Sequence, residues 1–154
     1  MGRKPVKVFI DSNVIISGIF SDTGSPRLIL DLLCLGLPFI RGATGRYNII
    51  EIERNLKRKM PQAIPTYKKY LPELNLEVIS IPSEKEIQKY RGHIAHKDVP
   101  VLVSAIKSDA DFLVTGDKKH FSKLKKCEDL EFKVVSPSEF LEKFITLFND
   151  FQVK

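Results

Sequence analysis

The chain has few cysteines and no zinc-type histidine spacing, and these absences exclude several kinds of site. Its two cysteines, Cys34 and Cys127, stand far apart and outside any Cys-x-x-Cys spacing, so we expect neither a disulfide framework nor a zinc site. The three histidines, His93, His96 and His120, do not have the spacing of zinc ligands either. This cysteine usage fits a protein of the reducing cytoplasm.

Long hydrophobic runs are also missing. The longest apolar-rich stretch, residues 28–40, is interrupted by Asp31 and is too short to span a bilayer. The apolar run that begins at Val6 contains Asp11 and Asn13, and no small-residue cleavage site follows it, so we expect no signal peptide. The sequence therefore predicts a cytoplasmic protein without membrane association.

The composition is that of a globular domain with a surplus of basic residues. The 154 residues are 43% hydrophobic and 29% charged, which allows one sizeable core, and they contain no internal repeat or linker. We expect a single domain over residues 1–154. The formal net charge of +6 favours association with polyanions, nucleic acid first among them, but does not establish it alone.

Apolar residues follow a pattern of short strands that alternate with helices. Strands are expected at residues 6–10, 38–40, 76–81, 111–115 and 132–135, with Gly42 and Gly45 in a loop. Helices are expected at about 13–20, 47–59, 65–74 and 99–107, and others begin near Pro26, Ser83 and Pro137. Ser83 and Ser136 are each followed three residues later by glutamate, the signature of a capping box. The alternation indicates an α/β domain of three αβα layers with a mostly parallel central sheet.

Four acidic residues are expected near one end of this sheet, where open parallel sheets bind their ligands. Asp11 and Asp117 follow the strands at 6–10 and 111–115, and Asp98 precedes the helix at 99–107. Glu51 lies in a helix among isoleucines, which indicates a partly buried position. If the two strands are neighbours, the carboxylates of Asp11 and Asp117 meet in one crevice.

Each acid also has a simpler interpretation. Asp98 could cap its helix, Asp117 could occupy a turn, Asp11 could close its strand in an Asx turn, and Glu51 could be a solvated helix residue. Four such acids at one end of a sheet are harder to explain as four separate structural roles. Clustered carboxylates repel one another, and a bound Mg²⁺ or Mn²⁺ relieves the repulsion because hard cations take oxygen ligands. Such an ion suits the hydrolysis of a phosphodiester.

The segments around these acids resemble the motifs of the PIN-domain family. An apolar strand followed by Asp-Ser-Asn stands at residues 8–17, and the other three resemblances lie at 51–56, 97–105 and 110–117. Their order, spacing and expected secondary structure agree over about residues 6–140. A lone Asp-Ser-Asn would be weak, whereas the full series is specific.

The resemblance implies a five-stranded sheet in the order 3-2-1-4-5, a Mg²⁺- or Mn²⁺-dependent nuclease and often a homodimer. Many small members resemble VapC-type toxins, which cleave RNA and are held inactive by a partner antitoxin. Carried over by position, the metal-binding and catalytic acids are Asp11, Glu51, Asp98 and Asp117. Asn13 and Thr115 would orient these carboxylates or a bound water.

The chain departs from the family pattern at two places. Glu53 competes with Glu51 as the second acid, and Glu51 is preferred because it matches the family's register. Many toxins carry a further acid shortly after the fourth motif, where this chain has His120, so the number of metal ions stays open.

Basic residues near the acids predict a rim that binds RNA phosphates. Arg54 and Arg58 stand three and seven residues after Glu51 and share its helical face, and Lys118 and Lys119 follow Asp117. The alternative is an ordinary solvated surface.

Three other functions are compatible with an α/β domain of this kind. The main alternative is a non-catalytic PIN scaffold that binds RNA or a protein partner. A receiver domain needs an aspartate at the end of the third strand, where this chain has residues 79–82 without one. A haloacid-dehalogenase-type phosphatase needs Asp-x-Asp after the first strand, and Asn13 replaces the second aspartate. The last two are therefore disfavoured.

Overall fold

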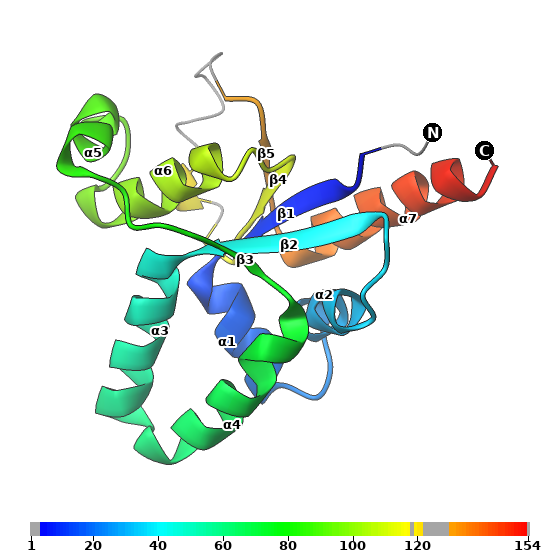
Figure 1. Cartoon of the computed structure of the whole chain (residues 1–154), viewed down its shortest axis with the longest axis horizontal. Helices are drawn as coiled ribbons and strands as arrows, with labels where there is room; N and C mark the ends of the chain where they lie inside the picture. The colour runs from blue at the N-terminus through cyan, green and yellow to red at the C-terminus, as the bar shows by residue number, and fades with distance from the viewer. Residues whose placement is uncertain (1–3, 118, 122–129, 154) are drawn as a thin grey trace.

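Five short strands lie side by side in a parallel sheet, and helices pack against both of its faces (Figure 1). The computed structural model describes residues 4–117, 119–121 and 130–153. The strands are β1 (Val6–Ile10), β2 (Ile40–Gly45), β3 (Glu77–Ile79), β4 (Phe112–Val114) and β5 (Lys133–Val135). Their order is β3-β2-β1-β4-β5 and every neighbouring pair is parallel, which confirms the predicted αβα fold and the 3-2-1-4-5 order.

Helices connect β1 to β2, β2 to β3 and β3 to β4, because parallel strands need a crossover that returns the chain to the same end of the sheet. The α-helices are α1 (Ser12–Phe20), α2 (Ser25–Cys34), α3 (Arg46–Lys59), α4 (Ile64–Tyr70), α5 (Glu84–Tyr90), α6 (Val99–Lys107) and α7 (Pro137–Val153). The 3₁₀ turns are η1 (Pro61–Ala63), η2 (Leu71–Leu74) and η3 (His96–Asp98). Within the residues that the structure describes, no helix is long and apolar enough to cross a membrane.

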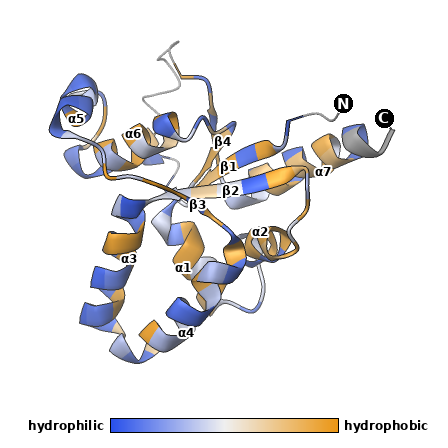
Figure 2. Ribbon diagram, in the orientation of Figure 1, coloured by the Kyte–Doolittle hydropathy of each residue, from blue (hydrophilic) through white to orange (hydrophobic). Residues whose placement is uncertain are grey.

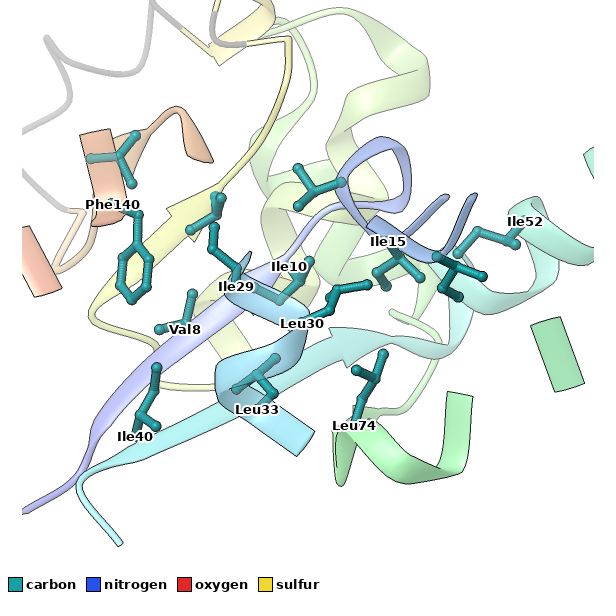
Figure 3. Packing of buried hydrophobic residues seen from close by; sticks show 14 of the residues in the cluster. Val8, Ile10, Ile15, Ile29, Leu30, Leu33, Ile40, Ile52, Leu74 and Phe140 are labelled. Carbon is teal, nitrogen blue, oxygen red and sulfur yellow. The ribbon is translucent and has the colours of Figure 1, made fainter. Parts of the chain in front are cut away.

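Alternation along the central strand β1 builds a hydrophobic core on each face of the sheet. Val8 and Ile10 point to one face and Phe9 to the other, and all three are fully buried. Side chains such as Leu30 of α2 join Val8 and Ile10 in the first core (Figure 3), whereas Leu102 of α6 joins Phe9 in the second. Burial of each such side chain contributes about 1.5–3 kcal/mol, so β1 and the loop that follows it are firmly held.

The long helices at the two sides of the molecule bury only one side each. Figure 2 shows hydrophobic and hydrophilic residues alternating along α3 and α7, the pattern expected of helices that cover a core and face solvent. On α3, Ile52 and Leu56 are buried, whereas Lys57 and Arg58 are exposed. This orientation of α3 decides which of its acidic residues faces the end of the sheet.

The second strand differs from the sequence-based expectation. The predicted strand over residues 38–40 was wrong, because β2 begins at Ile40 and continues through the two glycines that were expected in a loop. A Cβ atom on Gly42 would lie 2.6 Å from Leu76 Cδ2 and 3.0 Å from Leu33 Cδ1. Glycine is thus present in this strand because neighbouring leucines pack directly on its backbone.

The helix expected over residues 65–74 is also divided. Its first part is α4, and its second part is the 3₁₀ turn η2, which is followed by Asn75 with a φ of 53°. Pro72 has no N–H to donate in a continued α-helix, which accounts for the change of helix type.

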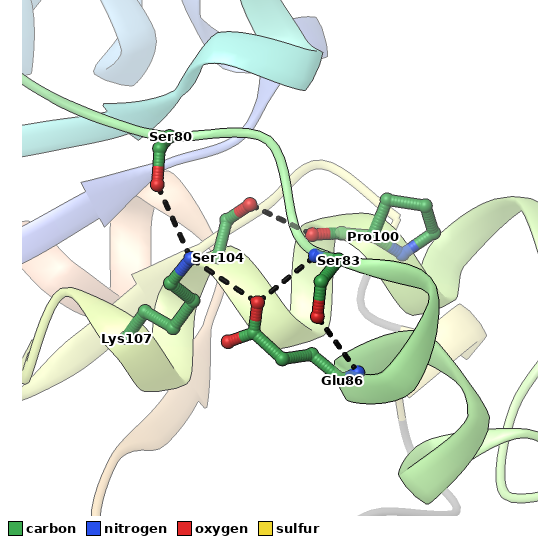
Figure 4. Close-up of polar contacts among 6 residues, drawn as sticks. All are labelled: Ser80, Ser83, Glu86, Pro100, Ser104 and Lys107. Carbon is green, nitrogen blue, oxygen red and sulfur yellow. Dashed lines mark hydrogen bonds and ion pairs between the residues drawn. The ribbon is translucent and has the colours of Figure 1, made fainter.

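Two helices begin with the predicted capping boxes. Ser83 Oγ accepts from Glu86 N across 3.2 Å, and Glu86 Oε1 accepts from Ser83 N across 2.9 Å (Figure 4). Ser136 and Glu139 make the same two contacts at 3.2 and 2.9 Å. Both reciprocal pairs satisfy N–H groups that a helix leaves without an internal partner.

Candidate functional site

Asp11 is placed at the end of the sheet by the pairing of β1 with β4. It follows β1 directly, and its main-chain N donates to Val114 O across 3.0 Å. Because parallel strands end at the same edge, the residues after β4 lie beside those after β1. Asp117 follows β4 after Thr115 and Gly116, so Asp11 and Asp117 lie near each other at this edge, as predicted.

The carboxylate of Asp11 is buried and has three hydrogen-bond donors. Oδ1 accepts from Ser12 N across 2.8 Å and from Asn48 Nδ2 across 3.2 Å, and Oδ2 accepts from Thr115 Oγ1 across 2.8 Å. The residue is 8% exposed. Its side chain is therefore held in one orientation before any ligand binds.

Burial makes the ionised form of Asp11 costly. Desolvation raises its pKa from 3.8 to about 6, although the hydrogen bonds from Thr115 and Ser12 act in the opposite direction. The charges of Glu51 and Asp117 raise it further. Glu51 and Asp117 thus both lie near enough to act on Asp11.

Asp117 is held by Asn13 and Thr115. Asn13 Nδ2 donates to Asp117 Oδ2 across 2.9 Å, and Asn13 Oδ1 accepts from Gly116 N across 3.0 Å. Thr115 Oγ1, which donates to Asp11, accepts from Asp117 N across 3.0 Å. Asn13 and Thr115 therefore contact the carboxyl-bearing residues that they were expected to support.

Asp98 occupies the position before α6, but its side chain does not cap the helix. Among the described residues, its Oδ2 atom is buried without a hydrogen-bond partner, and the Nδ1 atom of His120 lies 3.6 Å from it. Burial raises the pKa of Asp98, the charges of His120 and Lys97 lower it, and the charge of Asp117 raises it. The helix-cap interpretation of Asp98 was therefore wrong, and its carboxylate lies within electrostatic reach of Asp117.

Glu51 reaches the site from α3. It is half-buried, and its charge acts on Asp11 as well as on Tyr47, whose pKa is raised first by burial and then by Glu51. Glu53 acts instead on Tyr67, a buried residue of α4 whose pKa burial raises to about 12. Of the two competing glutamates, Glu51 is thus the one whose charge acts on Asp11.

Asn48 is a site residue that the sequence reasoning missed. It is completely buried, and its Nδ2 atom donates to both Asp11 Oδ1 and Ser12 Oγ, the latter across 2.8 Å. The available signal was its position three residues before Glu51, since residues three apart share a helical face. A buried asparagine among isoleucines at that position indicates a polar partner.

The basic residues expected at the rim are only partly described. Arg54 is exposed, and its charge lowers the pKa of the half-buried Tyr47, which the charge of Glu51 raises. Arg54 therefore lies on the same side of α3 as Glu51. Arg58 is exposed and donates to Asn55 Oδ1 across 3.4 Å. Lys119 is exposed, and Lys118 lies outside the described residues.

The donor chemistry of the site fits a hard divalent cation. All four candidate ligands offer carboxylate oxygens, and one of these, Asp98 Oδ2, is buried with no hydrogen-bond partner in the part of the chain that the structure describes. Among the residues that the structure describes, no three His, Cys, Asp or Glu side chains form a group that could hold an ion directly. Mg²⁺ takes one or two carboxylates and usually keeps several waters, so these residues fit an ion held partly through water.

Fold and site together define a class of protein: a parallel α/β domain with a carboxylate-lined site at the carboxyl end of its central strands. The family model of the PIN domain matches residues 7–119, a range that contains all four acids. The chain belongs to the PIN-domain family, a family of nucleases that generally use divalent metal ions. No curated protein matches the chain in sequence.

Solved structures with the same fold include two VapBC proteins. VapBC2 from Rickettsia felis, bound to a DNA fragment from its promoter, has a TM-score of 0.62 and 18% identity, over 85% of this chain and 98% of that one. PAE2754 from Pyrobaculum aerophilum has a TM-score of 0.64 and 16% identity, over 92% and 98%. VapBC-1 from nontypeable Haemophilus influenzae has a TM-score of 0.61 and 16% identity, over 86% and 99%. At these identities the likeness establishes the fold.

Proposed function

We propose that the chain is a Mg²⁺- or Mn²⁺-dependent endoribonuclease that hydrolyses RNA phosphodiester bonds. The observation that carries the proposal is the state of Asp11. Its carboxylate is buried and accepts hydrogen bonds on both oxygens, and the negative charges of Glu51 and Asp117 act on it. Keeping this buried carboxylate ionised lowers the stability of the fold, because burial disfavours the ionised form more than its hydrogen bonds favour it. A site that binds a cation accounts for it.

The ion would be held by Asp11, Glu51, Asp98 and Asp117. When bound, it would neutralise these carboxylates and stabilise the charge that develops on a scissile phosphate. Asn13 fixes Asp117, and Thr115 fixes both aspartates at the ends of β1 and β4. These two side chains keep the carboxylates from turning away from the substrate.

RNA would be bound by the basic rim around this site. Arg54 and Arg58 project from α3, and Lys118 and Lys119 follow Asp117 in the chain. Each lysine or arginine that neutralises a phosphate contributes to affinity in a way that weakens with salt. RNA affinity is therefore expected to fall as the salt concentration rises.

The biological role that we propose is that of a toxin in a toxin–antitoxin pair, acting in the cytoplasm. The support is the PIN family membership together with the fold shared with two VapBC proteins. The partners would be an antitoxin protein and a second copy of the chain in a homodimer. A neighbouring short reading frame that encodes a DNA-binding protein would support the antitoxin.

The test is cleavage of a fluorescently labelled single-stranded RNA by the purified chain. We expect cleavage in Mg²⁺ or Mn²⁺, and loss of cleavage after addition of a chelator or in Asp11→Asn. Asp31→Asn is the matched control, because Asp31 is an exposed acid of α2 that pairs with Arg27 away from the site. Its activity should equal that of the unmodified chain.

Three outcomes would contradict parts of the proposal. Cleavage that survives both the chelator and Asp11→Asn would rule out the metal nuclease. Salt-dependent RNA binding without cleavage under any metal would indicate a non-catalytic scaffold. Cleavage of a DNA strand of the same sequence at an equal rate would remove the specificity for RNA.

A further inference from the structure

Asn48 joins the first turn of α3 to the loop after β1. Its Nδ2 atom donates to Asp11 Oδ1 across 3.2 Å and to Ser12 Oγ across 2.8 Å. Ser12 Oγ in turn approaches the main-chain O of Asn48 at 3.5 Å. Glu51 lies about one helical turn further along α3, so these hydrogen bonds of Asn48 also set the position of Glu51 relative to Asp11.

The orientation of the Asn48 amide follows from the partners of its Nδ2 atom. An ionised carboxylate only accepts hydrogen bonds, so the NH₂ group must face Asp11. Asn48 Oδ1 then lies beside Gly45, where a Cβ atom would be 2.8 Å from Asn48 Oδ1 and 2.9 Å from Ser104 Oγ. Among the residues that the structure describes, this Oδ1 atom is buried without a hydrogen-bond partner. Ser104 Oγ itself donates to Pro100 O across 2.8 Å (Figure 4). Glycine at position 45 leaves the room that the amide occupies.

The two oxygens of Asp11 are consequently not equivalent. A carboxylate oxygen has about two lone-pair sites. Oδ1 uses both, for Ser12 N and Asn48 Nδ2, whereas Oδ2 uses one, for Thr115 Oγ1. With respect to the described residues, the free acceptor site of Asp11 is therefore on Oδ2.

We infer that Asn48 is a positioning residue that occupies Asp11 Oδ1, so that Asp11 offers only Oδ2 to a divalent cation. This rests on the proposed function, because it presupposes that Asp11 binds the ion. Coordination through one carboxylate oxygen suits Mg²⁺, which needs near-octahedral geometry, whereas Ca²⁺ readily accepts both oxygens of a carboxylate. Asn48 thereby favours the smaller ion.

The inference is tested by metal selectivity rather than by activity alone. Mg²⁺ and Ca²⁺ affinities are measured separately by calorimetry on the purified full chain and on Asn48→Leu, which has no side-chain donor. Partners of metal ligands typically change affinity by about 10–100-fold when they are removed. We expect the Mg²⁺ affinity to fall about tenfold and the Ca²⁺ affinity to fall much less or to rise. Infrared spectra of the Ca²⁺-loaded variant should show a carboxylate bound through both oxygens.

Ile52→Val is the matched control, because Ile52 is fully buried on the same helix and lies in the hydrophobic core. If Asn48→Leu does not fold, Asn48→Ala replaces it, since alanine also has no donor. In the Ile52→Val control we expect the ratio of the Mg²⁺ and Ca²⁺ affinities to stay as it is in the unmodified chain. Equal losses of Mg²⁺ and Ca²⁺ affinity in Asn48→Leu would overturn the inference while leaving the proposed function intact. An unmodified chain that binds neither ion would overturn both.

Discussion

Asn13 and Asp117 lie 104 residues apart in the sequence and are joined by a hydrogen bond of 2.9 Å between Asn13 Nδ2 and Asp117 Oδ2. The same side chain accepts from Gly116 N through Oδ1, so both ends of its amide are used. The first turn of α1 thereby holds the residues that follow β4. A carboxylate cannot replace this amide, because it has no donor.

Asn13→Asp should therefore lower activity without unfolding the protein. The new carboxylate would face Asp117 Oδ2, and the repulsion would turn Asp117 away from its position. We expect RNA cleavage to fall about 10–100-fold, as is typical when a partner of a metal ligand is lost. Ser17→Ala is the control, because Ser17 is an exposed residue of the same helix. Unchanged cleavage in Asn13→Asp would mean that the contact has no role in orienting Asp117.

Thr115 connects the two aspartates, and its hydroxyl cannot be removed without cost. Thr115→Val keeps the shape of the side chain but removes the donor to Asp11 and the acceptor for Asp117 N. The residue is completely buried, so we expect the free energy of unfolding to fall by about 1–3 kcal/mol. Urea denaturation measures the change. Thr115→Ser retains the hydroxyl, and a valine variant as stable as the serine variant would disprove the role of the hydroxyl.

Glu51 and Glu53 provide a direct comparison on one helix. The charge of Glu51 raises the pKa of Asp11, whereas the charge of Glu53 raises the pKa of the buried Tyr67. Glu51→Gln should therefore weaken Mn²⁺ binding and abolish RNA cleavage, and Glu53→Gln should leave both unchanged. Both substitutions remove one negative charge from α3, so a general effect of charge would appear in both variants. Loss of cleavage in Glu53→Gln alone would reverse the assignment.

The parts of the fold that the sequence predicted best are those with a strong local pattern. Alternation along β1 and the serine–glutamate pairs at Ser83 and Ser136 depend on residues close in the chain, and the structure confirms them. β2 was misjudged because Gly42 signals a loop locally, whereas its place in a strand depends on leucines from α2 and from the segment before β3. Short-range patterns do not contain that packing.

The site shows the same division. The proximity of Asp11 and Asp117 could be predicted, because strand ends in a parallel sheet meet at one edge. Asn48 could not be assigned a partner, because its bonds to Asp11 and Ser12 depend on the angle at which α3 meets the sheet. The choice between Glu51 and Glu53 likewise required the phase of α3, which its isoleucines alone do not determine.

Asp11 should make the stability of the metal-free protein depend on pH. Burial raises its pKa from 3.8 to about 6, so between these values the folded chain binds more protons than the unfolded chain. Stability therefore falls as the pH rises through this interval, by about 3 kcal/mol in total at 1.36 kcal/mol per pKa unit.

Asp11→Asn removes this titration, and its amide oxygen can still accept from Ser12 N and Asn48 Nδ2. We expect the variant to be more stable than the unmodified chain at pH 7 and equally stable near pH 3. Saturating Mg²⁺ should reduce the difference in stability between the two proteins at pH 7. An ion that binds only the folded state stabilises the unmodified chain, whereas the variant binds the ion weakly and gains little. Thermal denaturation at both pH values, with and without Mg²⁺, measures these effects. A variant that is less stable at pH 7 than the unmodified chain would show that the Asp11 carboxylate stabilises the fold, contrary to the role proposed for it.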